Sequence, residues 1–137
     1  MSFIPIQYDS GKLTRIEMEA ITFNKGEAVI ENGTAGYFTK AGAGTGSQVE
    51  YVMMETITTA ATQGDRHLAI RTQGVVFKAD TDADTIRTAV GTYCDLATVA
   101  TLDQDASADD QFYIERNLGA AADRKCIGRF AEGAPNA

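Results

Sequence analysis

Chemically reactive residues are scarce in this sequence of 137 residues, which has no tryptophan, one histidine and two cysteines. His67 has no serine or cysteine motif that it could activate as a nucleophile, so we interpret it as a surface or interface residue. Cys94 and Cys126 lie too far apart for a CxxC site, and we expect two small buried side chains. The sequence therefore predicts neither an enzyme nor a bound cofactor.

Long apolar runs are absent too, and none approaches the ~20 residues that a membrane-spanning helix needs. The first residues, MSFIPIQYDSGK, have neither the basic region nor the long apolar region of a secretory signal. We therefore expect a protein that is made in the cytoplasm and has no membrane partner.

Basic residues are few, since 12 lysines and arginines stand against 19 acidic residues and give a net charge of −7. This is the wrong sign for neutralising phosphates, and the basic residues are scattered apart from Arg124, Lys125 and Arg129. Nucleic acid is therefore not an expected partner.

The overall composition is that of an ordinary folded domain, with 44% hydrophobic and 23% charged residues. Most of the chain consists of short runs in which apolar and polar residues alternate, which favours a mainly β fold in one domain. In 12–23 a helical period competes with this alternation, and we prefer a strand. Strands are predicted at 12–23, 27–31, from 37 onward, 49–57, 68–71, 75–77, 92–102, 112–116 and 126–130.

Turn-forming residues separate these strands. Asn32-Gly33 predicts the turn of a hairpin, and Gln73-Gly74 predicts a hairpin or a bulge. One short helix or turn is expected between Asp80 and Gly91, with Asp82 or Asp84 as its cap.

Three segments resemble ligand sites but depart from the motifs in question. The glycine-rich run at 41–47 has no lysine where a P-loop needs it, so we interpret it as a surface loop. The acidic clusters at 80–84 and 103–110 have neither the glycine nor the glutamate that complete a calcium-binding EF-hand loop. We expect these aspartates to be helix caps and solvated turn residues and not metal ligands.

The N-terminal segment is unusually apolar, with Phe3, Ile4, Ile6 and Tyr8 around Pro5. Proline favours extended geometry in the residue before it, and an apolar extended segment is costly to leave in water. The segment is therefore either an arm that packs on a neighbouring molecule or the first strand of its own sheet. These five residues are our candidate interface.

We divide the chain into three parts on this basis. Residues 1–22 form an N-terminal arm and a first strand or helix, residues 23–130 form a β-barrel-like domain, and residues 131–137 form a flexible tail.

Several runs resemble, in their order and composition, the small capsid decoration (cement) proteins of tailed bacteriophages. The likeness covers Lys25 to Phe130 and is carried by KGEAVIENGTAGYFTKAGAG, EYVMMETI, VVFKADTDADTIRTAVGTYCDLA, FYIERNL and CIGRF. It implies a β-tulip-like antiparallel barrel without an active site. It also implies a homo-oligomer, with a trimer favoured, that binds the major capsid protein on the outer surface of the virion. Residues 1–11 would then be the arm that clamps neighbouring molecules.

Two other functions fit the same composition. One is a β module associated with the tail, baseplate or fibre of such a virus. The other is a carbohydrate-binding module, which the absence of tryptophan and the scattered tyrosines disfavour.

Overall fold

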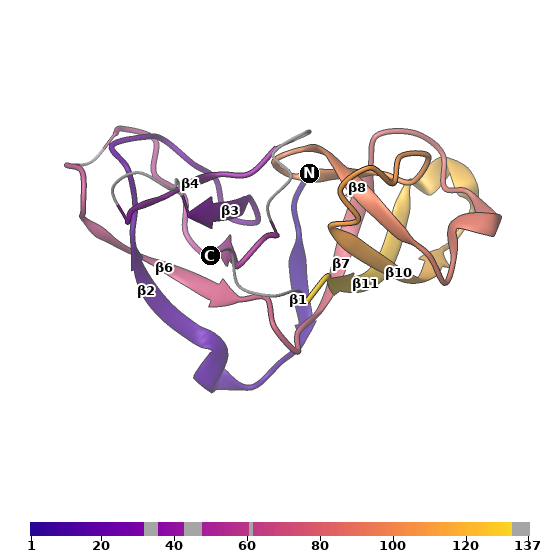
Figure 1. Ribbon diagram of the computed structural model, residues 1–137, viewed down its shortest axis with the longest axis horizontal. Coiled ribbons are helices and arrows are strands. Elements are labelled where there is room, and N and C mark those ends of the chain that lie inside the picture. Colours follow the sequence, from indigo (N-terminus) through magenta and orange to yellow (C-terminus); the bar gives the residue numbers. More distant parts are fainter. Residues whose placement is uncertain (32–35, 43–47, 61, 133–137) are drawn as a thin grey trace.

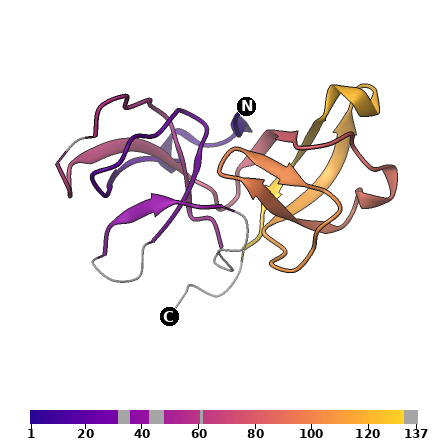
Figure 2. The same cartoon turned by 90° about the horizontal axis from the view of Figure 1, so that it is seen from above.

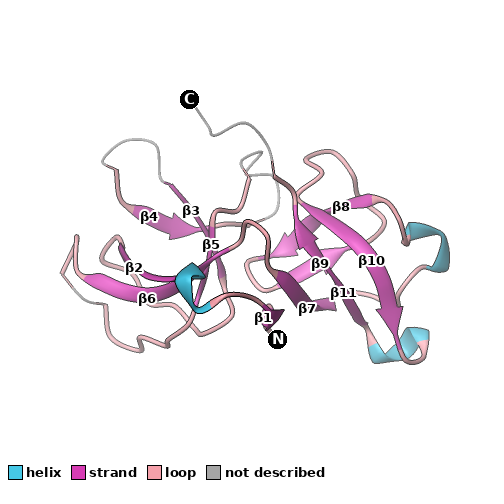
Figure 3. Ribbon diagram, turned by 90° about the horizontal axis from the view of Figure 1, so that it is seen from below, coloured by secondary structure: helices cyan, strands magenta, loops and turns pink. Residues whose placement is uncertain are grey.

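Two groups of strands lie side by side in the structure, a computed structural model (Figure 1; Figure 2). The residues that it describes are 1–31, 36–42, 48–60 and 62–132. Within them the chain forms eleven strands and the three short 3-10 helices η1 (Ser10–Lys12), η2 (Arg87–Ala89) and η3 (Ala121–Asp123), which Figure 3 shows in cyan. The prediction of a mainly β fold is confirmed.

The larger sheet, which we call the six-stranded sheet, has the strand order β1-β7-β11-β10-β8-β9. A further parallel pairing joins β9 to β7, so the sheet curls back on itself. All its other pairings are antiparallel. Its strands are β1 (Ile4–Gln7), β7 (Val76–Thr81), β8 (Tyr93–Thr98), β9 (Thr101–Asp103), β10 (Phe112–Leu118) and β11 (Lys125–Phe130).

The smaller sheet, which we call the five-stranded sheet, has the order β2-β6-β5-β3-β4 and is antiparallel throughout. A bridge between Met18 and Phe38 connects the end of β2 to β4 at the opposite edge. This sheet therefore also curls back on itself. Its strands are β2 (Leu13–Glu17), β3 (Ala28–Glu31), β4 (Phe38–Lys40), β5 (Tyr51–Met53) and β6 (Arg66–Arg71).

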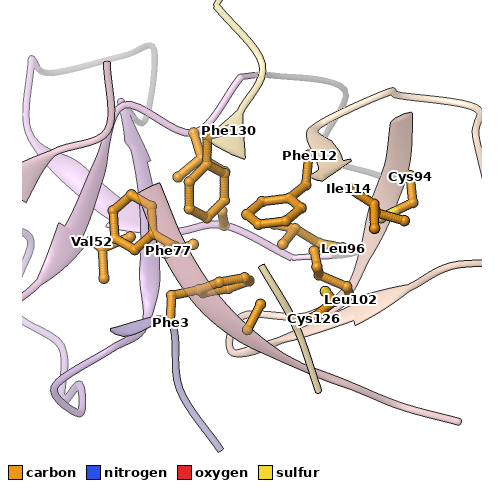
Figure 4. Packing of buried hydrophobic residues seen from close by; sticks show 14 of the residues in the cluster. Phe3, Val52, Phe77, Cys94, Leu96, Leu102, Phe112, Ile114, Cys126 and Phe130 are labelled. Carbon is orange, nitrogen blue, oxygen red and sulfur yellow. The ribbon is translucent and has the colours of Figure 1, made fainter. Parts of the chain in front are cut away.

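Both sheets contribute to one main hydrophobic core. Its centre consists of Phe3, Phe77, Phe112 and Phe130, and the ring of Phe130 lies 4.9–5.2 Å from the other three (Figure 4). Each fully buried phenylalanine stabilises the fold by about 1.5–3 kcal/mol relative to an exposed one. Val52 of the five-stranded sheet reaches the same core, so the two sheets share an interior.

A second, smaller cluster lies on the other face of the five-stranded sheet. Successive strand residues point to opposite faces, so Val52 enters the main core while its neighbour Met53 enters the second cluster. This explains why the run at 49–57 is apolar on both faces. The buried members of the second cluster are Ile16, Met18, Phe23, Val29, Met53 and Ala69.

Several predictions from local patterns are confirmed. Strand β2 lies within 12–23, where alternation competed with a helical period. Strands β3 and β4 pair as the predicted hairpin, although the Asn32-Gly33 turn lies outside the described residues. Most of the 41–47 loop and of the C-terminal tail also lies outside them.

Three local predictions were wrong in whole or in part. Gln73-Gly74 does not form a hairpin, because β6 and β7 belong to different sheets and the chain crosses between the sheets there. The short helix or turn expected between Asp80 and Gly91 is present as the single turn η2, but the expected aspartate cap was wrong, since Ile86 precedes this turn. The predicted strand at 92–102 is two antiparallel strands, β8 and β9, joined by a turn.

Residues 1–22 do not form a separate part. They supply β1 to the six-stranded sheet and β2 to the five-stranded sheet. The N-terminal segment is therefore a strand of its own sheet, the second of the two alternatives that the sequence left open.

Candidate functional site

Exposed large apolar side chains are concentrated in strand β1 and the residues that flank it. Four of the six large apolar side chains that are exposed there lie in the first eight residues: Met1, Ile4, Ile6 and Tyr8. Exposed fractions of 46% for Ile4, 48% for Ile6 and 43% for Tyr8 are high for such side chains. Contiguous exposed apolar surface on a folded domain is typical of an interaction site.

Alternation along β1 separates the buried from the exposed residues. Phe3 is only 1% exposed and contacts the rings of Phe112 and Phe130. Pro5 is half-buried and lies opposite the buried Phe77 of β7, whereas Ile4 lies opposite Lys78. The register shifts after Pro5, and Ile6 is exposed beyond this irregularity. One face of the strand thus anchors it, and the other face is open.

Polar contacts hold the start of this strand in place. The Phe3 N–H donates to the Gly26 carbonyl at 2.9 Å, and the Ser2 N–H donates to Asp80 Oδ2 at 3.1 Å. Lys125 Nζ donates to the other oxygen of Asp80 at 2.6 Å. Burial raises the pKa of the Asp80 carboxyl, but the hydrogen bonds from Lys125 and Ser2 outweigh it and keep the pKa below its ordinary value. Asp80 is therefore ionised at neutral pH and joins β1 to β7 and β11.

Gly26 makes this close approach possible. It has a φ of +91°, and a Cβ at this position would overlap with the Cβ of Ser2. Any other residue would therefore be strained and would displace the N-terminal segment. Gly26 also donates its N–H to the Met53 carbonyl at 2.7 Å, so it connects β1 to the five-stranded sheet.

The five predicted interface residues thus have different environments. Phe3 belongs to the protein's own core, and its side chain is not available to a partner in this structure. Ile4, Ile6 and Tyr8 are exposed, and Pro5 is intermediate. Their role in an interface stays a prediction.

Sequence reasoning missed two other exposed apolar residues, Val90 just after η2 and Tyr93 at the start of β8. Tyr93 pairs in register with Tyr113, and their ring centroids lie 5.1 Å apart. The alternation of Tyr93 with the buried Cys94 was the available signal, but only strand pairing shows that the two tyrosines meet.

Hydrogen bonds and ion pairs within the chain involve both acidic clusters. Asp95, which was not singled out from the sequence, is buried and accepts N–H bonds of 2.8 Å from Ala108, Asp109 and Asp110. Asp84 binds Arg124 at 3.1 Å. Among the described residues no group of three His, Cys, Asp or Glu side chains could hold a metal ion.

His67 is buried, and its interpretation as a surface or interface residue was wrong. Its Nδ1 lies 3.0 Å from Glu55 Oε1, and its ring packs edge-on against Phe23. It lies on β6 opposite Ile16 and therefore faces the second cluster. This arrangement satisfies a core histidine and includes no nucleophile.

The cysteines are buried and unpaired, as predicted. Burial raises the pKa of Cys94, and it raises that of Cys126 to about 11 although a hydrogen bond from Gln104 opposes the shift. Both thiols are therefore protonated at neutral pH and have little nucleophilic character.

Comparisons with known proteins found no matching family model, no matching curated protein and no matching solved structure. Within the described part of the chain, no helix has the length and apolar character to cross a membrane.

Proposed function

We propose that this protein is a structural component of a tailed-bacteriophage virion that decorates the outer surface of the capsid and stabilises the shell without catalysis. Its partners in this proposal are the major capsid protein and further copies of itself. The observation that carries the proposal is the open apolar face of β1, where Ile4 and Ile6 are about half exposed although Phe3 anchors the same strand in the core.

The position of β1 suits it to attachment. Among the described strands it pairs with β7 alone, so no described strand occupies its other edge, where a partner strand could pair. Pro5 has no N–H to donate to a further strand, which limits uncontrolled pairing. A strand that is fixed before binding also loses little conformational entropy when it binds.

A repeating shell would strengthen such a contact. A patch of a few apolar side chains is too small for a stable complex between two isolated proteins. When several linked copies bind to a lattice at once, the effective concentration of each further contact raises the overall affinity. The proposal therefore combines the apolar patch with self-association, and the resemblance described above favours a trimer.

The first test is to image the source particles by cryo-electron microscopy. We expect density for this chain at regularly repeated positions on the head, with β1 against the shell or a neighbouring copy. Density confined to a tail, baseplate or single vertex would contradict the proposal.

The second test uses particles that lack the protein. A protein that binds only the assembled shell stabilises that shell by mass action. Particles without it should release their genome at a lower temperature, and purified protein should restore the original temperature. Equal release temperatures with and without bound protein would contradict the proposal.

A variant pair connects this effect to β1. Ile6→Asp places a charge on the exposed face of β1, and Val90→Asp places one on an apolar residue of similar exposure outside β1. Both variants should fold, because neither residue is buried. Ile6→Asp should weaken binding to particles at least ~10-fold, while Val90→Asp should bind like the unmodified protein.

A further inference from the structure

Two tyrosines and an arginine form a row across three neighbouring strands of the six-stranded sheet. Tyr93 of β8 lies opposite Tyr113 of β10, and Tyr113 lies opposite Arg129 of β11. Paired residues point to the same face of a sheet, so all three side chains share one surface. The tyrosine rings meet at 61° and form an aromatic corner in which Tyr93 is 46% exposed.

Hydrogen bonds fix the polar groups around this corner. Arg129 Nε donates to Glu115 Oε1 at 2.7 Å, which orients the guanidinium group while the arginine side chain stays half exposed. Glu132 Oε1 accepts the Gly74 N–H at 3.1 Å, which holds a second carboxylate at the rim. The tyrosine rings therefore lie beside an oriented hydrogen-bond donor, Arg129, and an oriented acceptor, Glu132.

A surface pocket of about 380 Å³ lies at this place. Its volume is within the range of about 300–1,000 Å³ that is usual for pockets that bind small molecules. The residues that line it are Tyr93, Tyr113, Arg129, Phe130, Ala131 and Glu132.

The charges around the pocket restrict the class of ligand. Arg129 is paired with Glu115, and Glu132 brings a second carboxylate to the rim, so these three side chains together carry one negative charge and disfavour a phosphate or an acidic chain. A purely apolar ligand would bury the Arg129 and Glu115 charges without replacing their water. A neutral ligand with one apolar face and several hydroxyl groups avoids both costs.

We propose that this pocket binds a neutral glycan, with the apolar face of a sugar ring against the Tyr93–Tyr113 corner. Ring hydroxyls accept hydrogen bonds from Arg129 and donate them to the carboxylates of Glu115 and Glu132. In sequence the tyrosines are scattered, and this disfavoured a carbohydrate site. The fold removes that objection for two of the five tyrosines, because β8 and β10 place them in contact.

This site goes beyond the proposed attachment to a shell and does not depend on it. The tyrosines and the arginine of the glycan site lie on β8, β10 and β11, and none of them lies on β1, so the two sites use different residues. One molecule could therefore bind a shell through β1 and a glycan through the aromatic corner.

Titration of the isotope-labelled full chain by NMR tests the proposal. The probes are four neutral oligosaccharides, namely maltohexaose, cellohexaose, mannohexaose and N-acetylchitohexaose, each at about 10 mM so that affinities down to the millimolar range are detected. We expect at least one of them to shift the amide signals of residues 93, 113 and 129–132. Polysialic acid, an acidic glycan, should leave these signals unchanged.

Matched variants decide whether the tyrosine corner is responsible. Tyr93→Ala should reduce the affinity at least ~10-fold, and Tyr93→Phe should retain most of it because the ring remains. Tyr8→Ala removes an equally exposed tyrosine from β1 and should have no effect. The proposal is overturned if none of the four neutral probes shifts these signals, if polysialic acid binds more tightly, or if Tyr93→Ala binds unchanged.

Discussion

The six-stranded sheet packs four phenylalanine rings around one point, whereas the second cluster of the five-stranded sheet contains one buried phenylalanine, Phe23. The two sheets also differ in their exposed apolar side chains. Every large apolar side chain that is exposed in the described residues lies in or next to β1 or β8 of the six-stranded sheet: Met1, Ile4, Ile6, Tyr8, Val90 and Tyr93.

The two sheets differ both in how their interiors are packed and in which side chains they expose. A tightly packed aromatic core can hold strands rigidly while they present apolar surface to a partner. Exposed ion pairs occur on both sheets, such as Arg66–Glu17 on the five-stranded sheet and Arg129–Glu115 on the six-stranded sheet. The exposed apolar side chains, and not the charges, therefore distinguish the two sheets. The stability of the six-stranded sheet should therefore depend on the N-terminal strand and on the contact between the sheets.

The largest effect is expected for Phe3→Ala. Phe3 is the only residue before β1 that enters the main core, and truncation of a buried phenylalanine costs about 3–5 kcal/mol of unfolding free energy. Ile4→Ala, at the exposed neighbouring position, should cost about 0.5 kcal/mol or less. Urea denaturation followed by circular dichroism measures both values, and equal losses would show that β1 is not anchored as described.

A second test concerns the contact between the sheets at Gly26. Gly26→Ala should cost about 2–3 kcal/mol, since it combines an unfavourable φ with overlap against Ser2. Gly36 also has a positive φ, of +73°, but has open space around it, so Gly36→Ala should cost only about 1 kcal/mol. Thermal unfolding of the two variants compares them, and a larger loss for Gly36→Ala would contradict this role of Gly26.

A third test addresses Asp95, beneath the loop that follows β9. Asn at this position keeps the size of the side chain but loses the charge and replaces one acceptor with a donor, opposite the N–H groups of residues 108–110. Asp95→Asn should cost about 2 kcal/mol. Asp103 accepts one exposed N–H, from Asp105, so Asp103→Asn should cost under about 1 kcal/mol. Similar losses in urea denaturation would contradict the buried role of Asp95.

Local sequence patterns predicted most strands but not the sheet to which each belongs. Alternation identifies a strand because side chains alternate between two faces, and this is a property of neighbouring residues. The partner of a strand is not local, since Ser2 and Asp80 lie 78 positions apart. Gly74 is an example. Its positive φ predicts a turn, but such a turn can join two strands that pair with each other or two strands that belong to different sheets.

The same reasoning explains the outcome at the candidate surfaces. The apolar character of residues 3–8 was visible in the sequence, but which face of the strand is covered depends on Phe112 and Phe130 more than a hundred positions away. The Tyr93–Tyr113 corner likewise requires that β8 pair with β10. Pairing between distant strands, and not residue type, determines both surfaces.

The smallest expected effect is a difference in pH response between the two sheets. In the five-stranded sheet, burial and the neighbouring Glu31 raise the pKa of Glu50 above 4.5, so the ionised carboxylate destabilises the fold at neutral pH. In the six-stranded sheet, the pKa of Asp80 is below 3.8 because Lys125 and Ser2 overcome the effect of burial. Ionised Asp80 therefore adds its full amount to the free energy of unfolding above pH 3.8, and this stabilisation is lost as the pH falls through the lowered pKa.

Two neutral variants measure these contributions separately. At pH 7, Glu50→Gln should stabilise the protein and Asp80→Asn should destabilise it, each by on the order of 0.5 kcal/mol because solvent screens partly exposed charges. The stability gained by Glu50→Gln should shrink as the pH falls through the raised pKa of Glu50 and should be gone at pH 4.5. The stability lost in Asp80→Asn should stay constant down to pH 3.8 and shrink only below that pH. Unfolding free energies of both variants and of the unmodified protein, measured from pH 7 to below pH 3.8, show which of the two effects disappears first. If the effect of Asp80→Asn disappeared first, Asp80 would not be the ionised link that holds β1 in the six-stranded sheet.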